Sequence, residues 1–329
     1  MNSPAVIYTF RWLAWDTFQQ ALASRVFAVL LGLNCLCILF CLGVSIDGGN
    51  SLKGPGDIEL FDRSGQPLTG PNPEPARLRL AFGAIRVELP RDAEEGVHFL
   101  QVLMAKWVAG AVGLLLALIW TAGFIPDFLE PSAAAVLLAK PAPRWVLLAG
   151  KYCGVVLFVA LQAFVFFAGT WVALGVRTGV WLPGYLAGVP LLTAHFAVVY
   201  SFSVLIGVST RSTVACVFGS VLFWFICFGA NIARHAVVTM PQLAPQAAPY
   251  PQSFLTLVEI GYWILPKPAD LMMLLDSALQ AGEHFTMAPE FATVQAMGGF
   301  DPVLSLCTSL LFVAGMLGLA SHQLSVTDY

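Results

Sequence analysis

Residues 152–176 read YCGVVLFVALQAFVFFAGTWVALGV, a stretch without a single Asp, Glu, Lys or Arg. A helix that crosses a bilayer needs about 20 predominantly apolar residues. Each charged side chain near the centre of such a helix costs about 2.5 to 3.5 kcal/mol on insertion. This stretch therefore predicts a membrane-spanning helix, and the same pattern recurs along the chain.

The composition agrees with a membrane protein. Of the 329 residues, 58% are hydrophobic and 11% are charged, whereas a soluble domain carries about 25% charged residues. The net charge of -3 argues against a nucleic-acid partner, because phosphate recognition needs a basic face. The seven cysteines all lie in apolar stretches and form no C-x-x-C pair, so no disulfide framework or metal-ligand pair is expected.

The gaps between successive charged residues are long enough for six membrane spans. The predicted spans are residues 26–46, 102–125, 146–175, 185–209, 212–233 and 302–322. A further uncharged interval, 235–258, contains repeated prolines, which leave backbone carbonyls unpaired in lipid, and we do not expect it to cross. The expected fold class is an all-α polytopic membrane protein.

The distribution of Lys and Arg in short loops predicts the orientation, since these residues favour the cytoplasmic side. One face of the predicted bundle carries Arg11, Arg25, Lys140, Arg144, Lys151 and Arg211. The short loop on the other face carries Arg177 alone. We therefore expect both termini, including the tail 323–329, in the cytoplasm and the chain in the inner (cytoplasmic) membrane of the cell.

The segment before the first span, residues 1–25, predicts a helix lying in the membrane interface. Aromatic and apolar residues recur there at helical spacing, and indole rings favour headgroup depth. The residues expected to anchor the protein to the bilayer are Trp12, Trp15, Arg25 and, at the start of the third span, Lys151.

Two segments are expected outside the membrane on the opposite side. In residues 47–98, two short runs, 78–82 and 85–89, alternate between apolar and charged residues, which favours a small β-hairpin over the alternative of an irregular loop. In residues 234–301, the apolar runs 253–265 and 271–279 are too short to span. We expect them to form helices at, or dipping into, the outer leaflet.

The segment 126–144 separates the second and third spans and is expected in the cytoplasm. Pro131 suits a first helical turn, the following alanines favour helix, and Pro141 stops it. A short helix over 132–140 is predicted.

The chain lacks the motifs of the common catalytic sites: no P-loop, no H-E-x-x-H and no G-x-S-x-G is present. We therefore assign no catalytic, cofactor-binding or metal-binding residue and do not expect an enzyme. His195 and Ser201 share the fourth span, and satisfaction by neighbouring helices is the preferred interpretation over an intramembrane hydrolase. For Lys106, contact with lipid headgroups is preferred over a place in a substrate path.

The region around the predicted cytoplasmic helix, 132–140, resembles the type-2 permeases of ATP-binding-cassette transporters, the ABC-2 family. That family typically carries a Leu-Leu-x-Lys-Pro-x-x-Arg core followed by Leu-Gly-Lys-Tyr. The matching residues are Leu137, Leu138, Lys140, Pro141, Arg144, Gly150, Lys151 and Tyr152. The family's usual acidic-x-Gly-Thr lead-in is replaced by Glu130-Pro-Ser-Ala. Weaker matches are 17–26, 265–271 and Asp328-Tyr329.

The resemblance implies a permease subunit that works as a dimer, with a homodimer expected, and that is driven by a separate cytoplasmic ABC ATPase. It favours export as the direction of transport. ATP would be bound by that partner, and this chain would hold no cofactor. Leu137, Leu138, Lys140 and Arg144 would contact the ATPase. The alternative is a non-transporting membrane scaffold or a membrane-bound enzyme of another chemistry.

Two roles are open for Arg144: a contact through its charge alone, or a two-pronged bond to Asp127 or Glu130. The spans contain no ring of acidic residues, which favours an apolar or amphipathic substrate.

Overall fold

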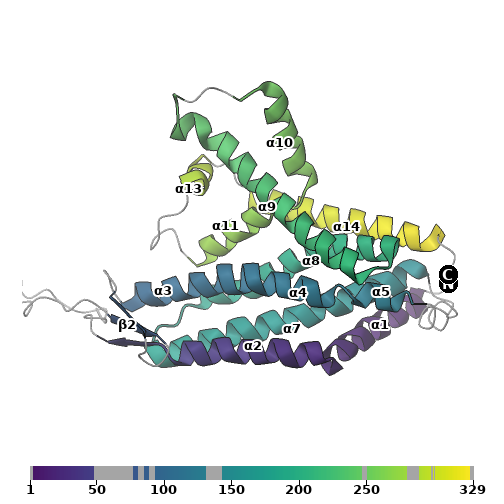
Figure 1. Cartoon of the computed structure of the whole chain (residues 1–329), viewed down its shortest axis with the longest axis horizontal. Coiled ribbons are helices and arrows are strands. Elements are labelled where there is room, and N and C mark those ends of the chain that lie inside the picture. Colours follow the sequence, from purple (N-terminus) through teal and green to yellow (C-terminus); the bar gives the residue numbers. More distant parts are fainter. Residues whose placement is uncertain are drawn as a thin grey trace, which may run out of the picture.

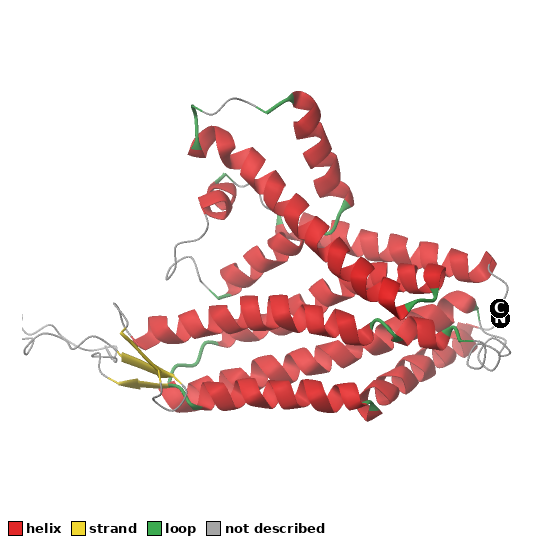
Figure 2. Cartoon of the chain, viewed as in Figure 1, coloured by secondary structure: helices red, strands yellow, loops and turns green. Residues whose placement is uncertain are grey.

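The computed structural model describes residues 3–47, 77–80, 85–88, 93–130, 143–246, 250–279, 289–297, 299 and 301–326. The described part is mainly helical (Figures 1 and 2). Five helices are long and apolar enough to cross a membrane, and a bent helix pair near the N-terminus would make a sixth. These helices indicate a membrane-embedded protein, in agreement with the expected fold class.

The bent pair consists of α1 (Ser3–Ala23) and α2 (Arg25–Leu42), which meet at 67°. Ser24 interrupts the helix with an extended backbone, and its Oγ accepts a hydrogen bond from the amide of Phe27. This N-cap satisfies a donor that the first turn of α2 leaves without a helical partner. The bend therefore separates the predicted interfacial helix from the predicted first span.

The second predicted span is a composite helix. It consists of α3 (Ala93–Leu103), the π-helical segment η2 (Met104–Gly113), α4 (Leu114–Thr121) and the short α5 (Phe124–Phe128). The π-helical segment was not expected from the sequence, because hydrophobic spacing does not distinguish i→i+5 from i→i+4 hydrogen bonding over so few turns.

The remaining long helices are α7 (Arg144–Thr178), α8 (Gly188–Thr210), α9 (Thr213–Leu243) and α14 (Pro302–Val326), and the 3₁₀ turn η3 (Pro183–Ala187) leads into α8. As a helix, α9 continues past the expected boundary at residue 233. Arg234 does not end it, since its guanidinium lies 4.3 Å from the ring centre of Tyr262 and 3.7 Å from Glu259. Pro241 falls only in its last turn.

The three strands lie at the end of the bundle opposite the start of α1 (Figure 1). The strands β1 (Ser45–Asp47), β2 (Arg77–Leu80) and β3 (Ile85–Glu88) form an antiparallel sheet in the order β1-β2-β3, with Leu78 opposite Val87. The sequence predicted the pairing of the last two strands but not the addition of β1. The short helices are α10 (Gln252–Ile264), α11 (Pro268–Ala278) and α13 (Pro289–Ala296), of which α13 was not expected.

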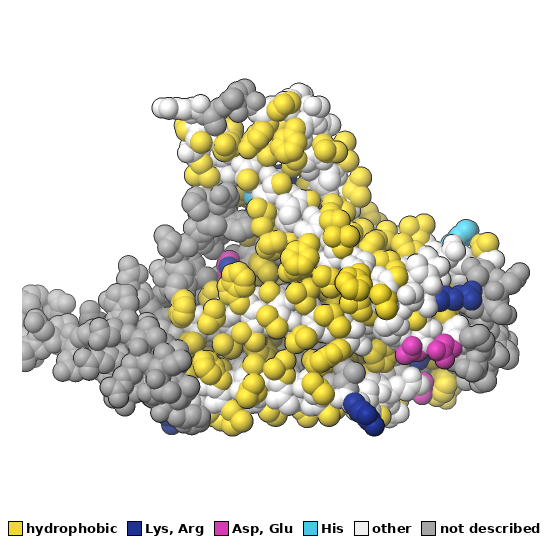
Figure 3. Space-filling model, in the orientation of Figure 1, with side chains coloured by type: hydrophobic (Ala, Val, Ile, Leu, Met, Phe, Trp, Pro, Cys, Tyr) yellow, Lys and Arg dark blue, Asp and Glu magenta, His cyan; other side chains and the backbone are white. Residues whose placement is uncertain are grey.

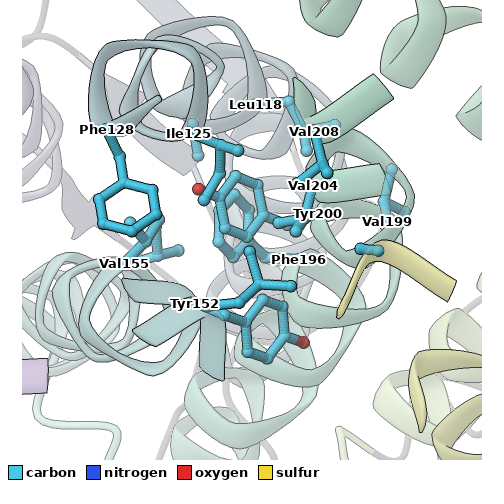
Figure 4. Close-up of a cluster of buried hydrophobic side chains, with 14 of the residues drawn as sticks. Leu118, Ile125, Phe128, Tyr152, Val155, Phe196, Val199, Tyr200, Val204 and Val208 are labelled. Carbon is cyan, nitrogen blue, oxygen red and sulfur yellow. The ribbon is translucent and has the colours of Figure 1, made fainter. Parts of the chain in front are cut away.

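The larger core cluster contains side chains of α1, α4, α5, α7, α8, α9 and α14, and Figure 4 shows part of it. Tyr152 of α7 stacks on Tyr200 of α8 with ring centres 5.8 Å apart, and its hydroxyl donates to the carbonyl of Ala197 at 2.8 Å. Hydrophobic side chains cover most of the face in Figure 3, and most of the charged side chains visible there lie toward the end where α1 begins and α14 ends.

Candidate functional site

A fully buried carboxylate, Asp270, occupies the first turn of α11 and is the centre of the candidate site. Its Oδ1 accepts from Asn231 Nδ2 at 3.0 Å and lies 2.8 Å from His235 Nε2. Its Oδ2 accepts from the Tyr262 hydroxyl and the Ser305 hydroxyl, both at 2.9 Å. We call these five residues the Asp270 cluster.

The cluster joins four helices that are distant in the sequence. Asn231 and His235 lie one turn apart on α9, Tyr262 lies on α10, and Ser305 lies in the first turn of α14. Asn231 also fixes the start of α11, because its Oδ1 accepts from the backbone amides of Ala269 and Asp270 at 2.8 and 3.1 Å. These are amides that a helix start leaves without a helical partner.

Two cations lie against the ring of Tyr262. The ammonium of Lys267 is 4.6 Å from the ring centre, and the guanidinium of Arg234 is 4.3 Å from it. Lys267 also donates to the Thr308 hydroxyl at 2.6 Å. Burial lowers the pKa of Lys267, while the Asp270 carboxylate acts in the opposite direction.

The ionised form of Asp270 is favoured by its hydrogen bonds. Burial alone raises the pKa of the carboxyl, but the hydrogen bond and charge of His235 and the hydrogen bonds from Asn231 and Ser305 outweigh it. The pKa of Asp270 is therefore lowered from its ordinary value. A buried carboxylate stays charged only where such donors surround it.

The geometry determines what the cluster can do. A Ser-His-Asp relay requires a hydrogen bond between the serine and the histidine. Here Ser305 bonds to Asp270 directly, on the oxygen that His235 does not contact, so the cluster is not arranged as that relay. Its evident effect is to hold α11 and α10 against α9 and α14.

Of the four residues expected at the ATPase contact, only Arg144 belongs to the described part of the chain. Leu137, Leu138 and Lys140, with the predicted helix 132–140, fall outside the described residues. Arg144 opens α7, and its Nη1 donates to the carbonyls of Leu324 and Ser325 in the last turn of α14, at 2.6 and 3.3 Å. Neither role expected for Arg144 included this partner.

The residues expected to anchor the protein in the bilayer differ in exposure. The side chains of Trp12 and Trp15 are 42% and 57% exposed on α1, and Arg25 is exposed. Lys151 is buried instead: its ammonium donates to Gln20 Oε1 of α1 at 3.1 Å and lies 5.7 Å from the ring centre of Phe128. Lys151 therefore contacts α1 and does not lie on the surface of the bundle, where it could reach lipid headgroups.

Two polar residues singled out in the spans have protein partners. His195 Nε2 accepts from the indole of Trp224 on α9 at 3.0 Å, in keeping with satisfaction by a neighbouring helix. Lys106 forms an ion pair with Asp276 of α11 at 2.8 Å. The preferred interpretation of Lys106, contact with lipid headgroups, did not include this pair.

Sequence reasoning missed the Asp270 cluster. Two signals were present: an Asn and a His at i and i+4 near the end of an apolar helix, and the Pro-Lys-Pro-Ala-Asp stretch 266–270. Neither signal predicts that Asp270 would lie next to Asn231 and His235. No model of a known protein family matches this chain, and no curated protein matches it.

Proposed function

We propose that this chain is the membrane-spanning permease subunit of an ATP-binding-cassette transporter of the ABC-2 type, an exporter that a separate ATPase drives. In this proposal two copies form a homodimer in the inner membrane, with both termini in the cytoplasm. ATP is bound and hydrolysed by the partner, since this chain contains no P-loop.

The observation that best supports the proposal is the set of contacts at the start of α7. Three residues of the motif that resembles the family each bind a different helix. Arg144 binds the end of α14, Lys151 binds α1, and Tyr152 binds α8. A force applied to the preceding segment would therefore reach three other helices through short hydrogen bonds.

The Asp270 cluster fits the same proposal at the N-terminal end of α14. It holds the α10 and α11 helices to α9 and α14, so that these four helices would move together. Since α14 is bound by Arg144 at one end and by Asp270 at the other, it offers a direct mechanical connection between the two ends.

The decisive test is co-purification with the ATPase. The permease and its candidate ATPase are expressed together, and the double variant Leu137→Asp, Leu138→Asp is compared with wild type. Loss of two apolar anchors should release the ATPase and remove permease-stimulated ATP hydrolysis while the permease stays inserted. Leu243 is an exposed leucine at the C-terminal end of α9, far in sequence from the predicted contact. Leu243→Asp is the matched control and should retain the ATPase. Unchanged binding and stimulation in the double variant would refute the contact.

The orientation and the dimer need their own measurements. In a background without native cysteines, Asp62→Cys and Ala134→Cys should be labelled from opposite sides of the membrane, and labelling from the same side would contradict the proposal. Native mass spectrometry of the purified complex should find two permease copies; a single copy would contradict the homodimer.

A further inference from the structure

An apolar cavity of about 130 Å³ lies between α2, η2, α4, α7 and α8. In Figure 1, α7 lies between α2 and the composite helix that contains η2. At the rim, Leu33 of α2 and Val112 of η2 are 36% and 54% exposed. The cavity therefore opens on the apolar flank of the bundle rather than at either end.

The cavity wall is almost entirely hydrophobic. Within the described parts of the chain, no Asp, Glu, Lys, Arg or His lines it, and the two side-chain amides in the wall are Asn34 and Gln162. Both lie near the middle of their helices, α2 and α7, which would place the cavity near the centre of the bilayer. A charged or strongly hydrated ligand has no compensating group at that depth.

One hydrogen-bond donor in the wall is unused. Gln162 Oε1 accepts from Asn34 Nδ2 at 2.8 Å, but Gln162 Nε2 is buried and has no partner among the described residues. A buried amide donor without a partner is costly, and a native structure seldom keeps one without a reason. The donor belongs to a side chain that lines the cavity.

The backbone on one side of the cavity is also unusual. Ala109, Val112 and Gly113 line it from η2, where the chain is π-helical. Segments of π-helix are rare and occur frequently at functional sites. Small side chains at Ala109, Gly113, Ala117 and Ala163 leave the space unfilled.

We infer that this cavity binds a neutral, apolar molecule that carries one hydrogen-bond acceptor and enters from the bilayer interior. The apolar wall would hold the hydrocarbon part, and Gln162 Nε2 would donate to the acceptor. A cavity of about 150 Å³ lined by apolar side chains binds benzene, so a molecule with a six-membered ring is of suitable size. The inference does not depend on the proposed transport function.

Cyclohexanone and methylenecyclohexane test it, since they have nearly the same shape and only the ketone accepts a hydrogen bond. Cys37 lines the cavity, whereas Cys35 on the same helix is exposed and does not. Full-length variants that retain only one of these cysteines are reconstituted in nanodiscs. The rate of labelling by methyl methanethiosulfonate is then measured against the concentration of each ring compound.

The ketone should slow labelling of Cys37 at about fivefold lower concentration than the alkene, as expected for one additional hydrogen bond, and should leave Cys35 unaffected. Gln162→Leu should remove the difference between the two compounds. Gln101→Leu is the matched control, because Gln101 is also a buried amide whose polar atoms have no partner among the described residues, and it does not line the cavity. It should keep the difference.

Two results would overturn the inference. If neither compound slows the labelling of Cys37, or if the labelling of Cys35 and Cys37 slows equally, the cavity holds no such ligand. If the ketone and the alkene protect Cys37 equally in the otherwise wild-type protein, Gln162 is not the donor. This second comparison needs no substitution at Gln162, so it decides the matter even where Gln162→Leu fails to fold.

Discussion

Arg144 Nη1 donates a hydrogen bond of 2.6 Å to the backbone carbonyl of Leu324, although 180 residues separate the two in sequence. The last carbonyls of a helix lack helical donors, and a cation there also interacts favourably with the helix dipole. Arg144, which is part of the motif that resembles the ABC-2 family, therefore joins the first turn of α7 to the last turn of α14.

We expect Arg144→Leu to lower the free energy of unfolding by about 1 to 2 kcal/mol, because a charge-assisted hydrogen bond is lost. Arg144→Lys should lose less, since it keeps the positive charge near the helix end. Thermal unfolding in detergent measures both, with Arg25→Lys at an exposed position as the control. A large loss of transport in Arg144→Lys at normal stability would instead favour a carboxylate partner, Asp127 or Glu130.

Asp270→Asn should destabilise the protein by about 3 kcal/mol or more, since it removes one partner of a buried charged network. One amide NH₂ would then face donors that now bond to the carboxylate. Asp301→Asn offers the same chemical change at an exposed position, where Asp301 Oδ1 accepts from the amides of Val303 and Leu304. Asparagine also caps helices well, so this control should be nearly silent. Similar stability of the two variants would show that the cluster contributes little.

The same carboxyl should make stability depend on acid. The pKa of Asp270 is lowered on folding, so its contribution is fully present above the unfolded value of about 4 and is lost as the pH falls through the folded-state pKa. Unfolding followed from pH 7 to pH 2 should therefore show a steeper acid loss in wild type than in Asp270→Asn. Parallel curves would assign the acid sensitivity to other groups.

Gly154→Ala should loosen the contact between α1 and α7. A Cβ at this position would lie 2.6 Å from Thr17 Cβ and 2.7 Å from the carbonyl of Ala14, so the helices must move apart. Such overpacking costs about 1 to 3 kcal/mol. Limited proteolysis of α1 and thermal unfolding report the change. Gly229→Ala, where a Cβ would meet no described residue within 4 Å, should leave stability unchanged or slightly raised.

The sequence by itself determined which segments are apolar helices. Hydrophobicity and charge are properties of consecutive residues. The gaps between charges therefore predicted most of the ends of the long helices α7, α8, α9 and α14 to within a few residues. The exception was the C-terminal end of α9, where Arg234 is accommodated by Tyr262 and Glu259.

Tertiary structure alone decided which side chains meet. Trp12 and Trp15 of α1 are exposed, while Leu13 and Thr17 pack on α7 at Gly150 and Gly154. The sequence could not have shown this, because an exposed apolar face and a buried one have the same composition in a membrane protein.

The same limit explains the candidate site. Asp270 is one acidic residue in a proline-rich stretch, and its partners on α9 and α14 lie 35 to 39 residues away. Their types are visible in the sequence, but the hydrogen bonds depend on how α9, α10, α11 and α14 pack. Packing is set by contacts between distant segments, whereas periodicity and charge spacing report only on neighbours along the chain.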